Sequence, residues 1–419
     1  MTSAKIFPLR DCGPGSAQGP ALPAAGATRP ASSIDLGRVE NSRVEFENWK
    51  GAADKPSPPP PAPTPPAQRV GFAVVGLGRL ALEEILPAFQ QSLHARVVAL
   101  VSSSPQKAAV VAAQYGVTSE AIYGYDDMHR LASNPDIQAV YVVTPNGLHL
   151  DHVRNAAQAG KHVLCEKPMA NTSDEARQMI DACAQAGVKL MIAYRCQFEP
   201  FNREAARLTQ SGELGRARVI EATNTQVQGP GDQWRLKAAL AGGGALPDIG
   251  LYCLNGVRAL LAEEPVEVYA QVVNPEGDPR YAEVEETMAF TLRFPSGAIA
   301  RCTASYGAHE SKDMRVRLEA GWIDVENAFA YRGQRMRVAR RKGDAEAVEE
   351  VRLGARNQFT LEIDHFAQCI ADDTAPHTPG EEGLQDQLLM EAIYRSAREG
   401  VPVAIGAASA HTPERQPQL

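Results

Sequence analysis

The sequence contains no pair of cysteines at C-x-x-C spacing, and its seven cysteines are scattered and odd in number. A disulfide framework or a structural zinc site would need such pairs, so we expect neither and predict no bound metal. No apolar run is long enough to cross a bilayer. The first thirty residues lack both an apolar h-region and a twin arginine. We therefore expect a cytoplasmic protein.

The chain also lacks an excess of positive charge, because its formal net charge is -8. This balance argues against binding to nucleic acid or to an anionic membrane. What remains is an ordinary globular composition, with 44% hydrophobic and 22% charged residues. A length of 419 residues allows two domains and a tail.

Residues 1–68 lack the composition of a packed core. Thirteen of the 30 prolines lie here, and Pro56–Pro66 predicts a stiff polyproline II spacer. We therefore predict a proline-rich, largely disordered N-terminal arm over 1–68, and a second tail over 405–419. The segment Arg43–Lys50 differs because it carries Val44, Phe46 and Trp49. This aromatic segment is either a chance feature of a disordered tail or a docking segment for a neighbouring subunit.

The stretch Arg69–Phe89 combines an apolar strand, a glycine turn and a helical pattern. The turn matches G-x-G-x-x-G/A, which in this context is typical of dinucleotide binding. The first glycine permits a tight turn, the second lets a pyrophosphate approach, and Ala81 allows close packing of helix on strand. An ordinary glycine turn is the alternative. The predicted cofactor-binding residues here are Gly76, Leu77, Gly78, Arg79 and Leu80.

Strand and helix patterns then alternate until Leu190–Ala193. They include a strand over Ala95–Ser102, a helix over Asp126–Ala132, and a helix over Thr172–Gly187 with a cap at Thr172 or Ser173. Repeated β-α units of this length predict a doubly wound parallel sheet of the Rossmann type over 69–193. After Tyr194 short strands with tight turns dominate, and two helical segments close the chain. We therefore predict an α/β protein whose C-terminal α+β domain, 194–404, is built on one open-faced, mostly antiparallel sheet. An apolar uncovered face on that sheet would demand a partner, so we expect a homodimer or homotetramer.

The end of the second predicted strand bears on the choice of cofactor. A carboxylate in this place selects NAD, but the segment Ser102–Lys107 contains none. Hydroxyl groups and a lysine suit the 2′-phosphate of NADP. A serine-rich turn with a solvated lysine is the alternative. Ser102 and Lys107 are the predicted ligands of this phosphate.

Polar residues follow several other predicted strands of the parallel sheet, at the edge where such sheets bind ligands. Lys167 follows the strand His162–Cys165 and could stabilise a developing alkoxide, or it could be a solvent-facing lysine. Further cofactor-binding candidates at the same edge are Tyr125, Pro145, Asn146, His149, Glu166, Lys167 and Arg195.

Asp248 and Tyr252 are four residues apart, so they share one face of a predicted helix. A carboxylate beside a phenol suits proton handling. Asp248 as a helix cap and Tyr252 as a core aromatic is the alternative, and the spacing does not decide between them. Arg195, Trp234 and Arg235 could line a sugar site by stacking and hydrogen bonding, or could belong to the scaffold.

Taken together, these motifs resemble the Gfo/Idh/MocA family of oxidoreductases over about Val70–Val403, and within it the glucose–fructose oxidoreductase subfamily. The segments that carry the resemblance are GLGRLA, PNGLH, CEKPMA, YRCQFEP, the stretch from Gln233 that ends in DIGLYCLNG, and PGEEGLQD. The resemblance implies a sugar substrate. It also implies that the lysine of E-K-P and the aspartate of D-x-G lie beside the nicotinamide, which makes Lys167 and Asp248 catalytic.

Many family members have histidine four residues after that aspartate, but this chain has Tyr252. The resemblance implies that Tyr252 takes the proton from the C1 hydroxyl of an aldose as hydride leaves for NADP⁺, and that Lys167 favours the tyrosinate. The substrate-binding residues would be Lys167, Arg195, Trp234, Arg235, Asp248 and Tyr252. In that subfamily the proline-rich arm crosses to a neighbouring subunit and covers the cofactor, while its exported members carry a twin-arginine signal.

Overall fold

The structure is a computed structural model that describes residues 38–40, 43–45, 64–229, 233–354 and 356–406. The chain divides into two compact units, Met1–Pro61 and Ala62–Leu419. In the first unit, β1 (Arg38–Glu40) and β2 (Arg43–Glu45) pair as an antiparallel hairpin, where the sequence predicted no element. Phe46 and Trp49 of the aromatic segment lie outside the described residues.

The second unit begins with a six-stranded sheet in the order β5-β4-β3-β6-β7-β8, in which every pairing is parallel. The chain runs outward from β3 to one edge, then returns and runs outward from β6 to the other. This reversal between β3 and β6 is the topological switch point at which such sheets bind ligands. The strands are β3 (Val70–Val75), β4 (Ala95–Val101), β5 (Ile122–Tyr123), β6 (Ala139–Val142), β7 (His162–Glu166) and β8 (Leu190–Ala193).

The helices between these strands have the boundaries that their caps dictate. The side chain of Ser104 caps α2, and that of Thr172 caps α4 by accepting the Glu175 N–H. Gly116 and Gly187 end these helices in the left-handed conformation. The helices are α1 (Leu86–Gln91), α2 (Pro105–Tyr115), α3 (His149–Gln158) and α4 (Ser173–Ala186). The predicted helix at 126–132 is instead the 3₁₀ segment η6 (Tyr125–Ser133).

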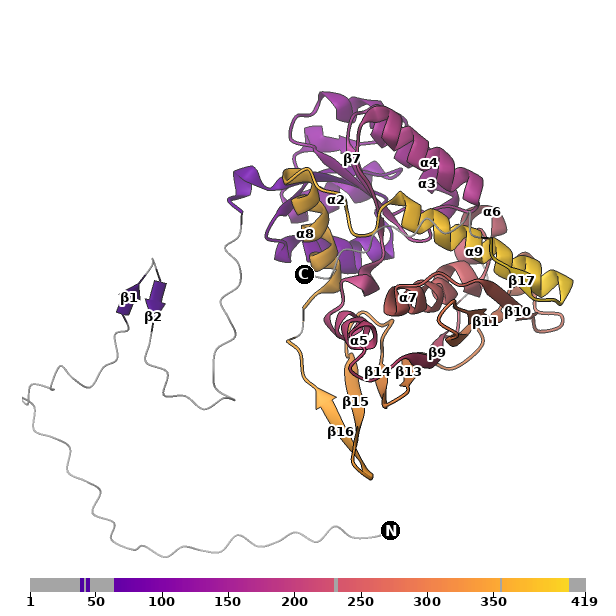
Figure 1. Ribbon diagram of the computed structural model, residues 1–419. Coiled ribbons are helices and arrows are strands. Elements are labelled where there is room, and N and C mark those ends of the chain that lie inside the picture. Colours follow the sequence, from indigo (N-terminus) through magenta and orange to yellow (C-terminus); the bar gives the residue numbers. More distant parts are fainter. Residues whose placement is uncertain (1–37, 41–42, 46–63, 230–232, 355, 407–419) are drawn as a thin grey trace, which may run out of the picture. The chain divides into compact units, whose positions relative to one another are not determined.

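The second sheet has nine strands in the order β16-β15-β14-β13-β9-β12-β11-β10-β17, seen edge-on below the first sheet in Figure 1. Its neighbouring strands are antiparallel except for β9 and β12. The strands are β9 (Ala217–Thr225), β10 (Glu267–Val273), β11 (Thr287–Arg293), β12 (Ile299–Ser305), β13 (Ser311–Leu318), β14 (Gly321–Glu326), β15 (Arg335–Lys342), β16 (Ala345–Val351) and β17 (Val403–Ala404). The predicted fold class, a parallel Rossmann sheet followed by a mostly antiparallel sheet, is confirmed.

Helices cover one face of the second sheet and connect it to the first. α5 (Pro200–Gln210) and α7 (Leu251–Leu261) pack on the strands. α8 (Gln358–Ala371) reaches back to α1, β3 and β4, and α9 (Gly380–Glu399) contacts α4, β8 and β10. The C-terminal helices therefore join the two sheets. The domain limits 69–193 and 194–404 remain a prediction.

The uncovered face of the second sheet differs from expectation, because much of it is charged rather than apolar. Arg301 pairs with Glu221 at 2.6 Å, and Asp324 lies between Arg315 and Arg337 at 2.8 and 2.9 Å. The strand registers place these five residues side by side, as a row of alternating charge across β12, β9, β13, β14 and β15. Cross-strand ion pairs thus occupy part of the face that we expected to be apolar and to demand a partner.

Candidate active site

The glycine turn lies at the carboxyl end of β3, at the switch point of the parallel sheet. Gly76 has φ +97°, and a Cβ there would come within 2.8 Å of the Val143 carbonyl oxygen. Only glycine fits this position. A Cβ on Gly78 would meet nothing within 4 Å, so the backbone there faces open space that a ligand can approach. Leu77 is buried, whereas Arg79 is exposed and pairs with Glu83.

The residues predicted to select the cofactor lie beside this turn. The Lys107 ammonium is 3.4 Å from the Leu77 carbonyl oxygen, although thirty residues separate them. Ser102 is buried, and its hydroxyl accepts the Ser104 N–H at 3.2 Å. The structure therefore brings one cation and a hydroxyl-rich turn to the glycine turn, with no carboxylate in the segment 102–107.

Lys167 and Asp248 meet where the two sheets approach each other. Lys167 directly follows β7, and Asp248 lies in the π-helical segment η10 (Leu246–Gly250) that leads into α7. The Lys167 ammonium donates to the Asp248 backbone carbonyl at 2.7 Å and lies 3.6 Å from its Oδ1. The E-K-P and D-x-G motifs thus form one site, which the sequence distance of 81 residues could not show.

Asp248 is held in its ionised form by its neighbours. Tyr306 donates its hydroxyl to Oδ2 at 2.8 Å, and the Arg235 guanidinium lies 3.2 Å from the same oxygen. Burial opposes ionisation of this carboxyl, but Arg235, Lys167 and the Tyr306 hydroxyl outweigh it and lower the pKa of Asp248. The carboxylate is therefore a fixed negative charge.

Tyr252 lies one helical turn after Asp248, against two cations. The Lys167 ammonium is 4.4 Å and the Arg195 guanidinium 4.6 Å from the centre of its ring. Burial raises the pKa of Tyr252 well above its ordinary value, while Arg195, which also hydrogen-bonds to it, acts to lower the pKa. Arg195 is therefore the cation that most directly favours the tyrosinate, because it also hydrogen-bonds to Tyr252.

Arg195 is buried in η8 (Arg195–Gln197), and its own donors are used inside the protein. It donates to Gln358 at 2.6 Å and to the Phe329 carbonyl at 2.8 Å, and it stacks on Tyr331 at 4.5 Å. This arrangement gives Arg195 a place behind Tyr252. Its predicted role as a ligand of the cofactor and the sugar remains a prediction.

Asn146 and His149 of the TPNGLH segment are both buried. Asn146, in η7 (Asn146–Leu148), donates to the Ala241 carbonyl at 2.8 Å and so ties this edge to α6 (Ala238–Ala241). His149 is fully buried, with Nε2 2.8 Å from the Thr144 carbonyl and Nδ1 3.0 Å from that of Pro168. Its ring therefore links the β6 edge to the E-K-P segment.

The remaining candidates border the same edge of the parallel sheet and the approach to Asp248. Pro145 precedes η7, and Tyr125 stacks on His152 with ring centres 4.7 Å apart. Trp234 and Arg235 lie together in η9 (Trp234–Leu236), with the guanidinium 4.6 Å from the Trp234 ring. This pair borders the site from the second sheet's side.

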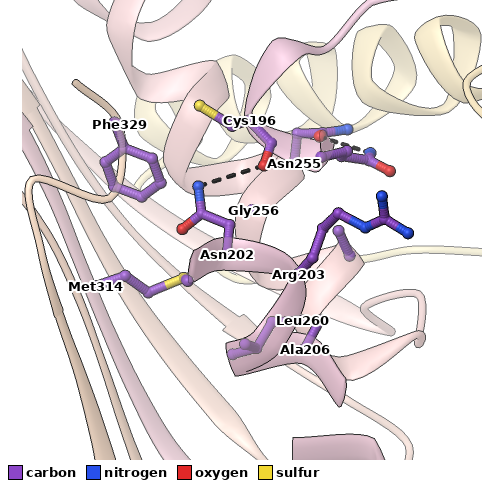
Figure 2. A pocket seen from close by; sticks show the side chains of 11 residues that line it. Cys196, Asn202, Arg203, Ala206, Asn255, Gly256, Leu260, Met314 and Phe329 are labelled. Atoms are coloured by element: carbon purple, nitrogen blue, oxygen red, sulfur yellow. Dashed lines mark hydrogen bonds between the residues drawn. The ribbon is translucent and has the colours of Figure 1, made fainter. Parts of the chain in front are cut away.

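A small cavity of about 30 Å³ lies behind this site, between α5, α7 and β13. Figure 2 shows Phe329 and Met314 on one side of it and Arg203 on the other, with the Asn202 amide donating to the Cys196 carbonyl at 3.3 Å. Neither Lys167 nor Asp248 lines it. The catalytic candidates therefore lie at the junction of the sheets and not in this cavity.

Sequence reasoning missed several residues that complete the site. They contribute through tertiary contacts from distant segments: Tyr306, Tyr331 and Gln358. Tyr306 directly follows β12, just as Lys167 directly follows β7. The end of an antiparallel strand does not mark a ligand-binding edge, however, so the position of Tyr306 gave no prediction.

Among the described residues, no three His, Cys, Asp or Glu side chains cluster as a metal site. Within the same ranges, no helix is long and apolar enough to cross a membrane.

A parallel sheet with a glycine turn at its switch point, facing a lysine, an aspartate and a tyrosine, defines a dinucleotide-dependent oxidoreductase. Family models agree. Residues 70–194 match the oxidoreductase family with an NAD-binding Rossmann fold, GFO_IDH_MocA, and residues 202–324 match the GFO/IDH/MocA C-terminal domain. The chain belongs to the Gfo/Idh/MocA family, as its motifs predicted, and it is an enzyme.

Two curated relatives and one solved structure show which enzymes the chain is similar to. The NADP⁺-linked D-xylose 1-dehydrogenase of Haloarcula marismortui is 36% identical over 334 residues, which are 78% of this chain and 91% of the relative. A second such enzyme, from Haloferax volcanii, is 32% identical and covers 80% of this chain and 99% of its own. The crystal structure of aldose–aldose oxidoreductase from Caulobacter crescentus, complexed with glycerol, is similar at 44% identity. Its TM-score is 0.78, covering 80% of this chain and 100% of that one.

Proposed function

We propose that this protein is an NADP-dependent sugar oxidoreductase that transfers hydride between C1 of an aldose and the nicotinamide. The observation that carries the proposal is the convergence of Lys167, Asp248 and Tyr252 at the carboxyl end of β7. The names of the relatives support the substrate class and the cofactor, because two are NADP⁺-linked xylose dehydrogenases and one is an aldose–aldose oxidoreductase.

The chain's residues fit NADP. Gly78 leaves open space for a pyrophosphate, and the N-terminus of the helix that follows faces the same turn. Lys107 supplies the positive charge that a 2′-phosphate needs. Bound NADP⁺ would supply the hydride acceptor.

The protein's own residues would handle the sugar and its proton. Lys167 donates a hydrogen bond to the C1 oxygen, while Tyr252 accepts the proton of the C1 hydroxyl as the C–H bond breaks, leaving a lactone. Arg195 offsets the cost of ionising Tyr252. Asp248, with its lowered pKa, keeps Lys167 in place and offers a carboxylate to a neighbouring sugar hydroxyl. Trp234 and Arg235 offer stacking and hydrogen-bonding groups at the entrance.

We further propose that NADP stays bound through the cycle, so that a second sugar is reduced where the first was oxidised. Support comes from the 44% identity to an aldose–aldose oxidoreductase and from the proline-rich arm directly before β3. A dehydrogenase with exchangeable cofactor is the second candidate, because the two curated relatives above are dehydrogenases.

We also propose a homodimer or homotetramer in which the uncovered faces of the nine-stranded sheets pair. The row of alternating charge is suited to pairing with a copy of itself across a twofold axis. The expected crossing of the N-terminal arm to a neighbour falls largely outside the described residues. Light scattering at micromolar concentration should show no monomer, and Arg315→Glu, which places like charges together, should lower the mass. An unchanged mass would place the interface elsewhere.

One experiment separates the candidate functions. The purified, extensively dialysed protein is analysed for bound nucleotide and then given aldoses with and without NADP⁺. A closed cycle predicts bound NADP and conversion of an aldose mixture with none supplied. Cofactor-free protein that is active only with added NADP⁺ would be an ordinary dehydrogenase. NADP binding without turnover of any aldose would mark a regulator. Activity that survives Lys167→Ala combined with Tyr252→Phe would contradict the assignment of these two residues as catalytic.

A further inference from the structure

Three buried side chains form a hydrogen-bonded group directly behind Lys167. The Tyr141 hydroxyl, from β6, lies 2.9 Å from Glu166 Oε1 at the end of β7 and 3.2 Å from Glu362 Oε1 on α8. Tyr141 and Glu362 have no exposed surface, and Glu166 is 7% exposed. The site as described uses neither Tyr141 nor Glu362.

The number of protons in this group is set by its geometry. A phenol has one proton, so it donates to one carboxyl oxygen and must accept from the other. An ionised carboxylate has no proton to give. If both contacts are hydrogen bonds, one of the two carboxyl groups is therefore protonated. Two carboxylates buried this close together would otherwise repel each other.

The surroundings decide which carboxyl group keeps the proton. The second oxygen of Glu166 accepts the Lys167 backbone N–H at 3.2 Å, whereas that of Glu362 has no hydrogen-bond partner among the described residues. Burial raises the pKa of both groups, but Lys167, the Tyr141 hydroxyl and Arg195 counteract it at Glu166. At Glu362 the charge of Glu166 adds to the rise, and Tyr141 and Arg195 oppose it. Lys167 supplies its further opposition at Glu166.

In the described part of the chain, Arg195 is the cation that acts on Glu362 from the elements around α8. The titratable groups that act on it come from β6, β7 and η8, and are Tyr141, Glu166, Arg195 and Cys196. β3 and α1 contain no charged residue. Arg96 of β4 pairs with Asp136, while Glu83 and Glu84 of η4 pair with Arg79 and Arg332.

We propose that Glu362 is a positioning residue that stays a neutral carboxylic acid and, by donating its proton to Tyr141, holds the single carboxylate of Glu166 in place behind Lys167. Glu166 in turn holds the Lys167 backbone. A second negative charge here would also hinder ionisation of Tyr252, whose pKa Glu166 already acts to raise. The effect on Lys167 rests on the proposed function, but the protonation of Glu362 does not.

Infrared spectroscopy of the full-length protein tests the protonation state directly. At neutral pH the wild-type protein should show the carbonyl stretch of a protonated carboxylic acid, and Glu362→Gln should remove it. Glu276→Gln, at an exposed glutamate, should leave it unchanged and serves as the control. Burial also raises the pKa of Glu285 and Asp386, so the band is read in the difference spectrum between wild type and Glu362→Gln. A difference spectrum without this band would overturn the proposal.

The pH dependence of unfolding gives a second test that needs no activity. The folded state keeps the Glu362 proton while the unfolded chain releases it near its ordinary pKa. Above that pKa the wild type therefore loses stability as the pH rises. The denaturation midpoint of Glu362→Gln, relative to wild type, should increase from pH 4 to pH 8. A constant difference, or one of opposite sign, would mean that Glu362 is ionised in the folded protein.

Activity then tests the positioning role. Glu362→Ala should lower kcat about tenfold or more with a smaller change in KM. The substitution removes the hydrogen bond between Glu362 and Tyr141, and Tyr141 then holds Glu166 less firmly. The conservative Glu362→Gln should restore most of that loss, since its amide can donate to Tyr141. Equal losses in both variants would show that Glu362 does not act through a donated proton. An inactive wild type would contradict only the proposed function, and the two tests above would remain readable.

Discussion

Tyr306 donates its hydroxyl to Asp248 Oδ2 at 2.8 Å, which joins the end of β12 to the start of α7. The same oxygen lies 3.2 Å from the Arg235 guanidinium. One carboxylate oxygen is thus fixed from two directions, while the other lies 3.6 Å from Lys167. The orientation of Asp248 towards Lys167 therefore depends on a tyrosine 58 residues further along the chain.

Removing the Tyr306 hydroxyl should lower kcat/KM without unfolding the protein. Tyr306→Phe takes away one of the contacts that lower the pKa of Asp248, so the pKa should rise and the acid limb of kcat/KM should move to higher pH. Hydrogen bonds to charged groups contribute roughly 1.5–3 kcal/mol, so kcat/KM should fall about 10-fold to 100-fold. Tyr281→Phe is the matched control, because the Tyr281 hydroxyl is buried without a hydrogen-bond partner in the described part of the chain. An acid limb at an unchanged pH would show that Tyr306 does not affect the ionisation of Asp248.

The two reaction directions should differ in their response to pH. Burial raises the pKa of Tyr252, so the phenol is protonated at neutral pH and the tyrosinate fraction grows as the pH rises. Oxidation of an aldose needs the tyrosinate and should accelerate with pH. Reduction of a lactone or ketose uses the protonated phenol and should be flat over the same range. Initial rates from pH 6 to pH 10 check this, and Tyr252→Phe should abolish the difference. The same pH slope in both directions would exclude Tyr252 as the proton carrier.

Two glycines of one turn should respond differently to alanine. Gly76→Ala forces a side chain into a left-handed backbone position and against the Val143 carbonyl, so it should destabilise the fold by about 1–2 kcal/mol or more. Gly78→Ala meets nothing within 4 Å in the protein, so it should fold normally but bind NADP more weakly. Thermal unfolding and nucleotide titration measure the two effects. Normal NADP affinity in Gly78→Ala would mean that the pyrophosphate does not approach this backbone.

The choice between nicotinamide cofactors should depend on the neighbouring segment. Ser102→Asp combined with Lys107→Ala adds a negative charge and removes a positive one beside the glycine turn. NADP binding should weaken far more than NAD binding, because only NADP carries the 2′-phosphate. Lys237→Ala, which removes an exposed lysine paired with Glu283, is the control. Equal losses for both cofactors would show that these two residues do not contact the phosphate.

The order and type of most elements follow from local signals in the amino-acid sequence. Strands such as β4 and helices such as α4 appear where apolar periodicity and capping residues predicted them, because these signals are local. The sequence also identifies the family and the three central candidates, because Lys167, Asp248 and Tyr252 lie in contiguous motifs. Local patterns were less reliable at η6, where a predicted α-helix is a 3₁₀ segment.

The surroundings of those candidates depend on tertiary contacts. Tyr306 and Glu362 reach the site from β12 and α8, and no sequence periodicity encodes a contact between residues this far apart. Folding likewise places Arg195 against the Tyr252 ring, with donors that reach Gln358 and backbone carbonyls. A side chain's chemistry is fixed by its type. Its charge state and its accessibility are set by the neighbours that folding places around it.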